Sequence, residues 1–77
     1  MNLSKALSLI LKYNRHKVGL SQEELAYKCN LDRTYISLLE RGKRNPTLNV
    51  LFGISSALNL STSEFVKQIE DMMYINS

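Results

Sequence analysis

The feature that most constrains this chain is the short distance between two helix-start signals. Ser21 and Glu24 form an S-x-x-E capping box, in which each side chain bonds a backbone N–H at a helix N-terminus. Asp32, a second capping residue, follows so soon that only about three residues separate the two helices. A link this short forces the helices to cross sharply instead of forming an antiparallel hairpin.

Small and apolar residues stand where such a crossing needs them. Ala26 has a side chain small enough to let the helix after Asp32 approach closely. Asn30 lies in the link, where a left-handed residue is wanted, and Asn tolerates that conformation. Four apolar residues are expected to fill the wedge between the helices: Leu25, Leu31, Ile36 and Leu39. Residues 22–41 are therefore predicted to form a helix-turn-helix unit.

Helix signals recur along the chain, whereas no stretch alternates apolar and polar residues as a strand would. The expected helices span about residues 3–17, 22–29, 33–41, 48–58 and 62–74. On the fourth of these we expect a buried stripe made of Leu48, Leu51, Ile54 and Leu58. The sequence thus predicts a single all-α domain over residues 1–77, with five helices in a compact arrangement.

Charge is divided unequally along the chain. Residues 1–45 carry nine Lys or Arg against four Asp or Glu, and residues 46–77 carry one against three. A basic front indicates a surface for a polyanion, although such charge also serves solubility alone. No apolar run reaches the roughly 18 residues of a membrane span. The single Cys29 fits a reducing compartment, so we expect a cytoplasmic protein without a membrane partner.

The segment GLSQEELAYKCNLDRTYISLLERGKRNPT, residues 19–47, resembles the Xre-type, lambda-repressor-like helix-turn-helix domains. The likeness is carried by GLSQEELA, Ile36, LERG, a basic loop and Pro46, and it extends from Leu3 to about Leu60. Within that family, the chain length, LDRTYIS and a fifth helix make the chain similar to the small controller proteins of restriction–modification systems. Asn30 is a departure, because most family members have glycine there.

The resemblance implies that the helix after Asp32 lies in the DNA major groove with its N-terminal end against the bases. By matching position, base contacts fall on Arg33, Thr34 and Leu38, and contacts with the DNA backbone fall on Gln22, Arg41, Lys43, Arg44 and Asn45. It also implies an ion pair between Arg15 and Glu40, which makes Arg15 a scaffold residue in preference to a DNA contact.

The chemistry of these side chains agrees with base reading. Arg33 can give two parallel hydrogen bonds to guanine O6 and N7, and the hydroxyls of Thr34 and Ser37 can donate or accept. Tyr35 can reach a phosphate with its hydroxyl, or rest its ring on a thymine methyl group or a sugar. Leu38 leaves two alternatives open, a contact with a thymine methyl group or cover for the edge of the core.

The last expected helix carries more apolar surface than a four-helix core of this size needs. We expect it to form an isologous dimer together with the end of the fourth helix. The interface residues would be Leu58, Leu60, Phe65, Ile69, Met72 and Met73. The alternative is that this helix packs on its own core in a monomer.

These expectations together describe a dimeric, sequence-specific DNA-binding regulator on a palindromic operator. We expect no enzyme activity, cofactor, metal or small-molecule effector, and RNA polymerase is left open as a partner through Glu23 and Glu24. Cys29 is expected in the core and His16 at the surface. The alternatives are a phage-type repressor or antitoxin or, in a different class, a helical adaptor that binds a protein through its last helix.

Overall fold

The computed structural model describes residues 1–75, which contain helices and no strand. The helices are α1 (Leu3–Lys17), α2 (Gln22–Lys28), α3 (Arg33–Glu40), α4 (Leu48–Ala57) and α5 (Thr62–Tyr74). The all-α, five-helix prediction is confirmed. The second, third and fourth helices each end one residue earlier than predicted, because Cys29, Arg41 and Leu58 are their C-caps.

Each helix begins where a short polar side chain satisfies a free backbone N–H. At the start of α2, the Glu24 N–H donates to Ser21 Oγ at 3.0 Å and the Ser21 N–H donates to Glu24 Oε1 at 2.9 Å. Hydrogen bonds from the Ser21 backbone and hydroxyl lower the pKa of Glu24. Asp32 caps α3 through a 2.8 Å bond from the Tyr35 N–H. The two starts that frame the helix-turn-helix unit are therefore fixed locally.

The link between α2 and α3 turns sharply at one left-handed residue. Asn30 has a φ of 57°, as the turn requires, although it lacks the conformational freedom of glycine. The Leu31 N–H donates to the Ala26 carbonyl at 2.9 Å, which closes the turn over the end of α2. Asn30 therefore serves in the position where the resemblance leads one to expect glycine.

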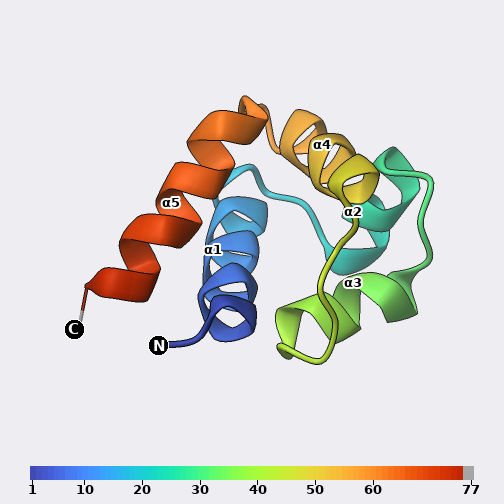
Figure 1. The fold of residues 1–77 in the computed structure, drawn as a ribbon. Coiled ribbons are helices and arrows are strands. Elements are labelled where there is room, and N and C mark those ends of the chain that lie inside the picture. Colours follow the sequence, from blue (N-terminus) through green and yellow to red (C-terminus); the bar gives the residue numbers. More distant parts are fainter. Residues whose placement is uncertain (76–77) are drawn as a thin grey trace.

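Helix α1 lies at the centre of the molecule, between α5 on one side and α3 on the other (Figure 1). Helix α2 packs against α3 and α4, and α4 also contacts α5. All five helices contribute side chains to one core, among them Leu11, Leu25, Ile36, Ile54 and Phe65, each fully buried. Cys29 packs against this core with its Sγ 3.7 Å from the Gly53 carbonyl oxygen, and burial raises the pKa of its thiol.

Two expectations about buried surface are wrong. Leu48 is 68% exposed, because it opens α4 and faces outward, so the buried stripe of α4 excludes it. Leu58, Phe65 and Ile69 are at most 5% exposed and belong to the core of the single chain. The apolar face of α1 is wide enough to need cover on both sides, and α5 covers the side away from α3. The apolar character of Leu58, Phe65 and Ile69 therefore does not indicate a partner.

No helix within residues 1–75 combines the length and the apolar character needed to cross a bilayer.

Candidate nucleic-acid interface

Helix α3 has two faces with different surroundings. Ile36 and Leu39 are fully buried on the inner face. Because successive residues of a helix are rotated by about 100°, the side chains that point away from the core come from residues 33, 34, 37, 38 and 41. Arg33 and Thr34 are exposed, and Ser37 and Leu38 are half-buried. Four of the five residues predicted to contact bases therefore share the outer face.

Two surface hollows run along this outer face. A hollow of ≈ 260 Å³ is lined by Arg33, Thr34, Ser37 and Arg41, and it offers guanidinium and hydroxyl groups. A second hollow of ≈ 370 Å³ is lined by Asp32, Thr34, Tyr35, Leu38 and Arg44. Thr34 contributes to both. Tyr35 differs from the others because it also packs against the hydrophobic core, so only part of its ring is available outside.

The basic loop after α3 is folded back by a glycine cap. Gly42 has a φ of 70°, its N–H donates to the Leu39 carbonyl, and the Lys43 N–H donates to the Leu38 carbonyl at 2.9 Å. This pattern turns the chain sharply and leaves the side chains of Lys43 and Arg44 exposed. The Ser4 hydroxyl donates to Asn45 Oδ1 at 2.8 Å and so ties the loop to the first turn of α1. The cations predicted to contact the DNA backbone thus stand at the end of α3 on a loop held at both ends.

A buried ion pair holds the inner side of α3. Arg15 Nε lies 2.6 Å from Glu40 Oε2, and Arg15 Nη2 donates to Glu40 Oε1 at 2.9 Å. The two side chains are only 9% and 3% exposed. Arg15 Nη1 also donates to the Leu20 carbonyl, so the pair joins α1, the α1–α2 link and α3. The predicted ion pair is present and Arg15 has the scaffold role expected of it.

Gln22 is turned toward this ion pair. Its Nε2 donates to Glu40 Oε1 at 3.1 Å, and the residue is half-buried. One of the two amide protons of Gln22 is therefore committed to the scaffold. The contact between Gln22 and a DNA phosphate stays a prediction, and the position gains a structural role that the sequence did not reveal.

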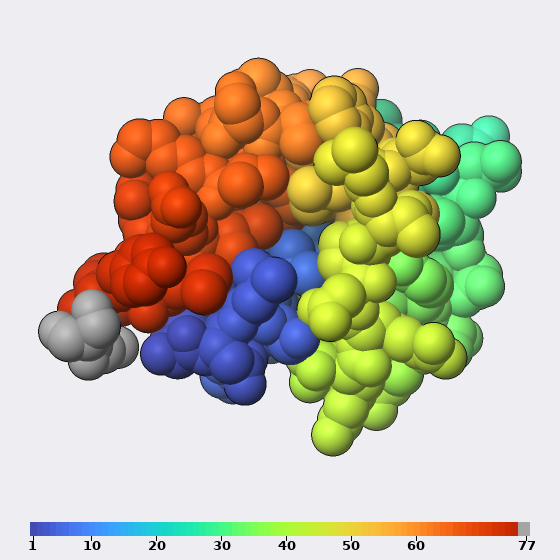
Figure 2. Space-filling view, viewed as in Figure 1, coloured from blue at the N-terminus to red at the C-terminus, as the bar shows by residue number. Residues whose placement is uncertain are grey.

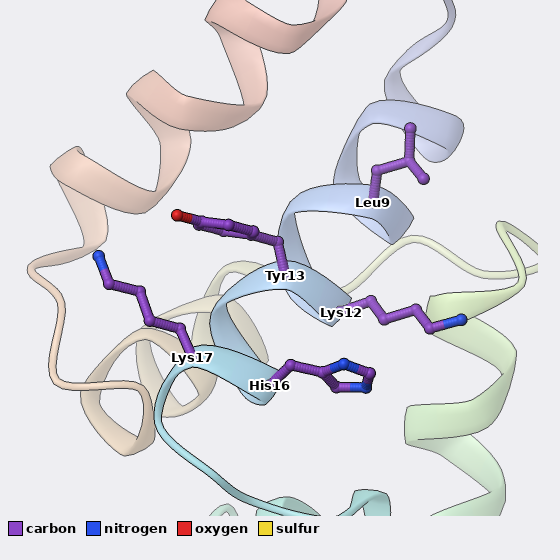
Figure 3. A pocket seen from close by; sticks show the side chains of 5 residues that line it. All are labelled: Leu9, Lys12, Tyr13, His16 and Lys17. Atoms are coloured by element: carbon purple, nitrogen blue, oxygen red, sulfur yellow. The ribbon is translucent and has the colours of Figure 1, made fainter.

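A basic and aromatic cluster on α1 was also missed by sequence reasoning. Leu9, Lys12, Tyr13, His16 and Lys17 line a hollow of ≈ 550 Å³ on one exposed face of this helix (Figure 3). Their spacing of three and four residues was a readable signal for a shared face. Lys17 Nζ lies 6.0 Å from the centre of the Tyr13 ring. This hollow is larger than the two on α3. Because all its lining residues come from a single helix, it is less enclosed by other elements.

The exposed apolar surface lies elsewhere than predicted. Leu60, Met72 and Met73 are half-buried against the core, in addition to the three buried residues described above. A groove of ≈ 250 Å³ opens instead where the first turn of α1, the basic loop, α4 and α5 meet (Figure 2). Its lining is mostly apolar and includes the exposed Leu3 and Val66, while Leu48 and Phe52 are exposed four residues apart on α4, outside that lining. We call these four residues the α4–α5 patch.

A model of the helix-turn-helix family, HTH_3, matches residues 11–65. The chain belongs to this family. The match contains the whole of α2, α3 and α4, and so both hollows on α3 and the basic loop.

Individual relatives agree with the family and narrow it. The control protein C.MunI from a Mycoplasma species is 46% identical over 59 residues, which cover 77% of this chain and 80% of that protein. The restriction–modification controller protein C.Esp1396I, solved as a tetramer in complex with its natural 35 base-pair operator, is 40% identical, with a TM-score of 0.84. That alignment covers 95% of this chain and 96% of the other.

A regulator of clp genes has a similar fold. This protein, ClgR from Corynebacterium glutamicum, is 27% identical with a TM-score of 0.91, over 97% of this chain and 80% of that chain. The resemblance to the Xre-type family and to restriction–modification controller proteins, expected from the segment 19–47, is confirmed by these comparisons.

Proposed function

We propose that this chain is a sequence-specific DNA-binding transcription regulator that acts as a dimer and controls a restriction–modification system. The observation that carries the proposal is the outer face of α3, where Arg33, Thr34 and Ser37 stand exposed or half-exposed beside a cationic loop. A rigid helix with donors on its first turns and cations behind it suits a major groove flanked by phosphates. The similarity to controller proteins supports the choice of regulated system.

Base reading and backbone contact are assigned to different residues. Arg33 pairs with guanine O6 and N7, while the hydroxyls of Thr34 and Ser37 bond neighbouring base edges. Leu38 belongs to the same face, and Tyr35 reaches the DNA through the exposed part of its ring and its hydroxyl. Arg41, Lys43, Arg44 and Asn45 contact phosphates, which fixes the register of α3 on the duplex.

We assign the dimer interface to the α4–α5 patch. Leu3 and Val66 at the apolar groove, with Leu48 and Phe52 exposed on α4, give apolar surface that a second copy can cover by a twofold axis. The related controller protein C.Esp1396I is a tetramer on its operator, which supports self-association. Such a dimer binds a palindromic site with half-sites about one helical turn apart.

Regulation then follows from concentration, because dimerisation and operator binding are coupled by mass action. No small-molecule effector, cofactor or enzymatic reaction is part of the proposal, and the site of action is the cytoplasm. RNA polymerase is the proposed protein partner during activation. Its surface would meet the outer face of α2, where Glu23, Glu24, Tyr27 and Lys28 line a hollow of ≈ 390 Å³ and Tyr27 is 87% exposed.

Selection of binding sites from a random DNA pool tests the function. We expect a palindromic consensus, bound with an affinity that falls linearly in the logarithm of salt concentration. Absence of binding to any duplex at low salt would remove the proposal. The genes beside that of the chain separate the two regulator alternatives, since a methyltransferase and a restriction enzyme indicate a controller, and a toxin or phage lysis genes indicate an antitoxin or phage repressor.

Phe52→Asp tests the interface. A charge within the α4–α5 patch should give a monomer by sedimentation at micromolar concentration, because a charge buried in the interface would have no partner. The helical content should be unchanged, because Phe52 is 56% exposed and contributes little to the core. Tyr13→Asp is the matched control, an aromatic residue that is 59% exposed on α1, and it should stay dimeric. A dimer that survives Phe52→Asp would place the interface elsewhere.

A further inference from the structure

The second hollow on α3 combines one apolar side chain with a polar rim. Leu38 is its aliphatic lining residue, and Asp32, Thr34, Tyr35 and Arg44 surround it in a volume of ≈ 370 Å³. Leu38 is not among the partly buried apolar residues that pack against the core within residues 1–75, so cover of the core does not account for an aliphatic side chain on the outer face of α3. Its surroundings therefore bear on what the hollow binds.

Helix geometry and the loop hold Leu38 in this position. Ile36 and Leu39 fill the inner face, and a rotation of about 100° per residue turns Leu38 away from both. Leu38 is half-buried, and its carbonyl oxygen accepts the 2.9 Å bond from the Lys43 N–H that folds the basic loop back. That return brings Arg44 to the rim of the hollow. The apolar side chain is thus fixed beside a cation that lies on the phosphate-contacting loop.

The rim groups match one kind of base edge. In the major groove, the C5 methyl group of a pyrimidine is the apolar feature, and a polar group at C4 stands next to it. The Thr34 hydroxyl can donate to the O4 of thymine, and Arg44 at the same rim can bind the phosphate of that nucleotide. The Thr34 hydroxyl can accept a hydrogen bond from the N4 amino group of 5-methylcytosine. The Asp32 carboxylate can accept one as well, in addition to the bond that its Oδ1 already accepts from the Tyr35 N–H. Both bases share the methyl group that an aliphatic side chain can cover.

We propose that Leu38 is a specificity-determining residue that binds the C5 methyl group of one pyrimidine in each half-site, with Thr34 and Arg44 on the polar edge of the same base and its phosphate. The inference rests on the proposed function, because it requires α3 in the major groove. It adds that binding depends on a single methyl group, so a thymine at this position is distinguished from unmethylated cytosine, and methylation of a cytosine there strengthens binding.

The test uses the full chain and the operator obtained from the random pool. Each thymine is replaced in turn, in both half-sites, by deoxyuridine, which removes only the methyl group. Each cytosine is replaced in the same way by 5-methylcytosine. Dissociation constants are measured for the wild type, for Leu38→Ala and for Leu9→Ala, a matched control in which a partly exposed leucine of α1 is shortened. Thermal melting checks that the variants are folded, and Leu38→Asn, which keeps the length and branched shape of the side chain but has polar atoms in place of its methyl groups, replaces Leu38→Ala if the alanine variant unfolds.

At one pyrimidine position in each half-site, the methyl group should tighten binding of the wild type and of Leu9→Ala by about fourfold, the ratio that corresponds to burial of one methylene group. The Leu38 variant should bind the two forms equally. A loss with deoxyuridine identifies thymine as the ligand, and a gain with 5-methylcytosine identifies the methylated cytosine.

Two results overturn the inference and leave the proposed function intact: no position at which a methyl group matters, or a methyl effect that persists in the Leu38 variant. Failure of the wild type to bind any duplex instead overturns the proposed function itself.

Discussion

The two sides of α3 differ in what their residues contact, and the difference separates stability from recognition. On the inner side, Ile36 and Leu39 are fully buried and Glu40 is bound by Arg15 and Gln22. On the outer side, Arg33 and Thr34 are exposed and line hollows open to solvent. The same short helix therefore carries residues whose loss should change the fold and residues whose loss should change only DNA binding.

The largest effect is expected on the inner side. Glu40→Ala leaves the Arg15 guanidinium buried without its carboxylate, and this should lower the free energy of unfolding by about 3–5 kcal/mol. Urea denaturation measures the loss. Asp71→Ala is the matched control, because it breaks the Lys67–Asp71 pair, whose side chains are 65% and 64% exposed, and it should change stability little. Equal losses in the two variants would mean that burial does not set the value of the Arg15–Glu40 pair.

Gln22→Ala tests whether Gln22 stabilises the inner side of α3 or contacts DNA. Removal of a hydrogen bond to a charged group should lower the free energy of unfolding by about 1.5 kcal/mol, because Glu40 Oε1 loses one of its donors. The same urea experiment measures it. Unchanged stability together with weaker DNA binding would return Gln22 to the phosphates, as the family resemblance implies.

The smallest effect is expected in the basic loop. Lys43→Ala should weaken binding to all sequences alike and should reduce the slope of log affinity against log salt by about one, because one fewer counterion is released. Stability should be unchanged, since the Lys43 side chain is exposed and only its backbone N–H takes part in the cap. A change in base preference would show that Lys43 reaches the bases.

Much of this arrangement was predictable because its signals are local. The capping box at Ser21, the cap at Asp32 and the short link between them determine α2, the turn and α3, and each was read from neighbours in sequence. The Arg15–Glu40 pair joins distant segments, and it was predicted only through the family resemblance.

The errors concern contacts that periodicity does not describe. Spacing placed Phe65 and Ile69 on one face of a helix, but it did not tell whether that face meets α1 or a second chain. The same reasoning buried Leu48, whose place at the first turn of α4 faces outward. Leu38 was left open between DNA and core because its role depends on the loop that Gly42 turns back, and the contact of Gln22 with Glu40 was missed because it joins distant segments.

The measurement that tests the central claim most directly is a repeat of the random-pool selection with Arg33→Ala beside the wild type. Arg33 is exposed and lines the outer hollow, so the variant should keep its thermal stability. We expect loss of preference at one base pair in each half-site, a guanine in the wild-type consensus, at a cost of about 1–3 kcal/mol in discrimination. An unchanged consensus would contradict the assignment of base reading to the outer side of α3.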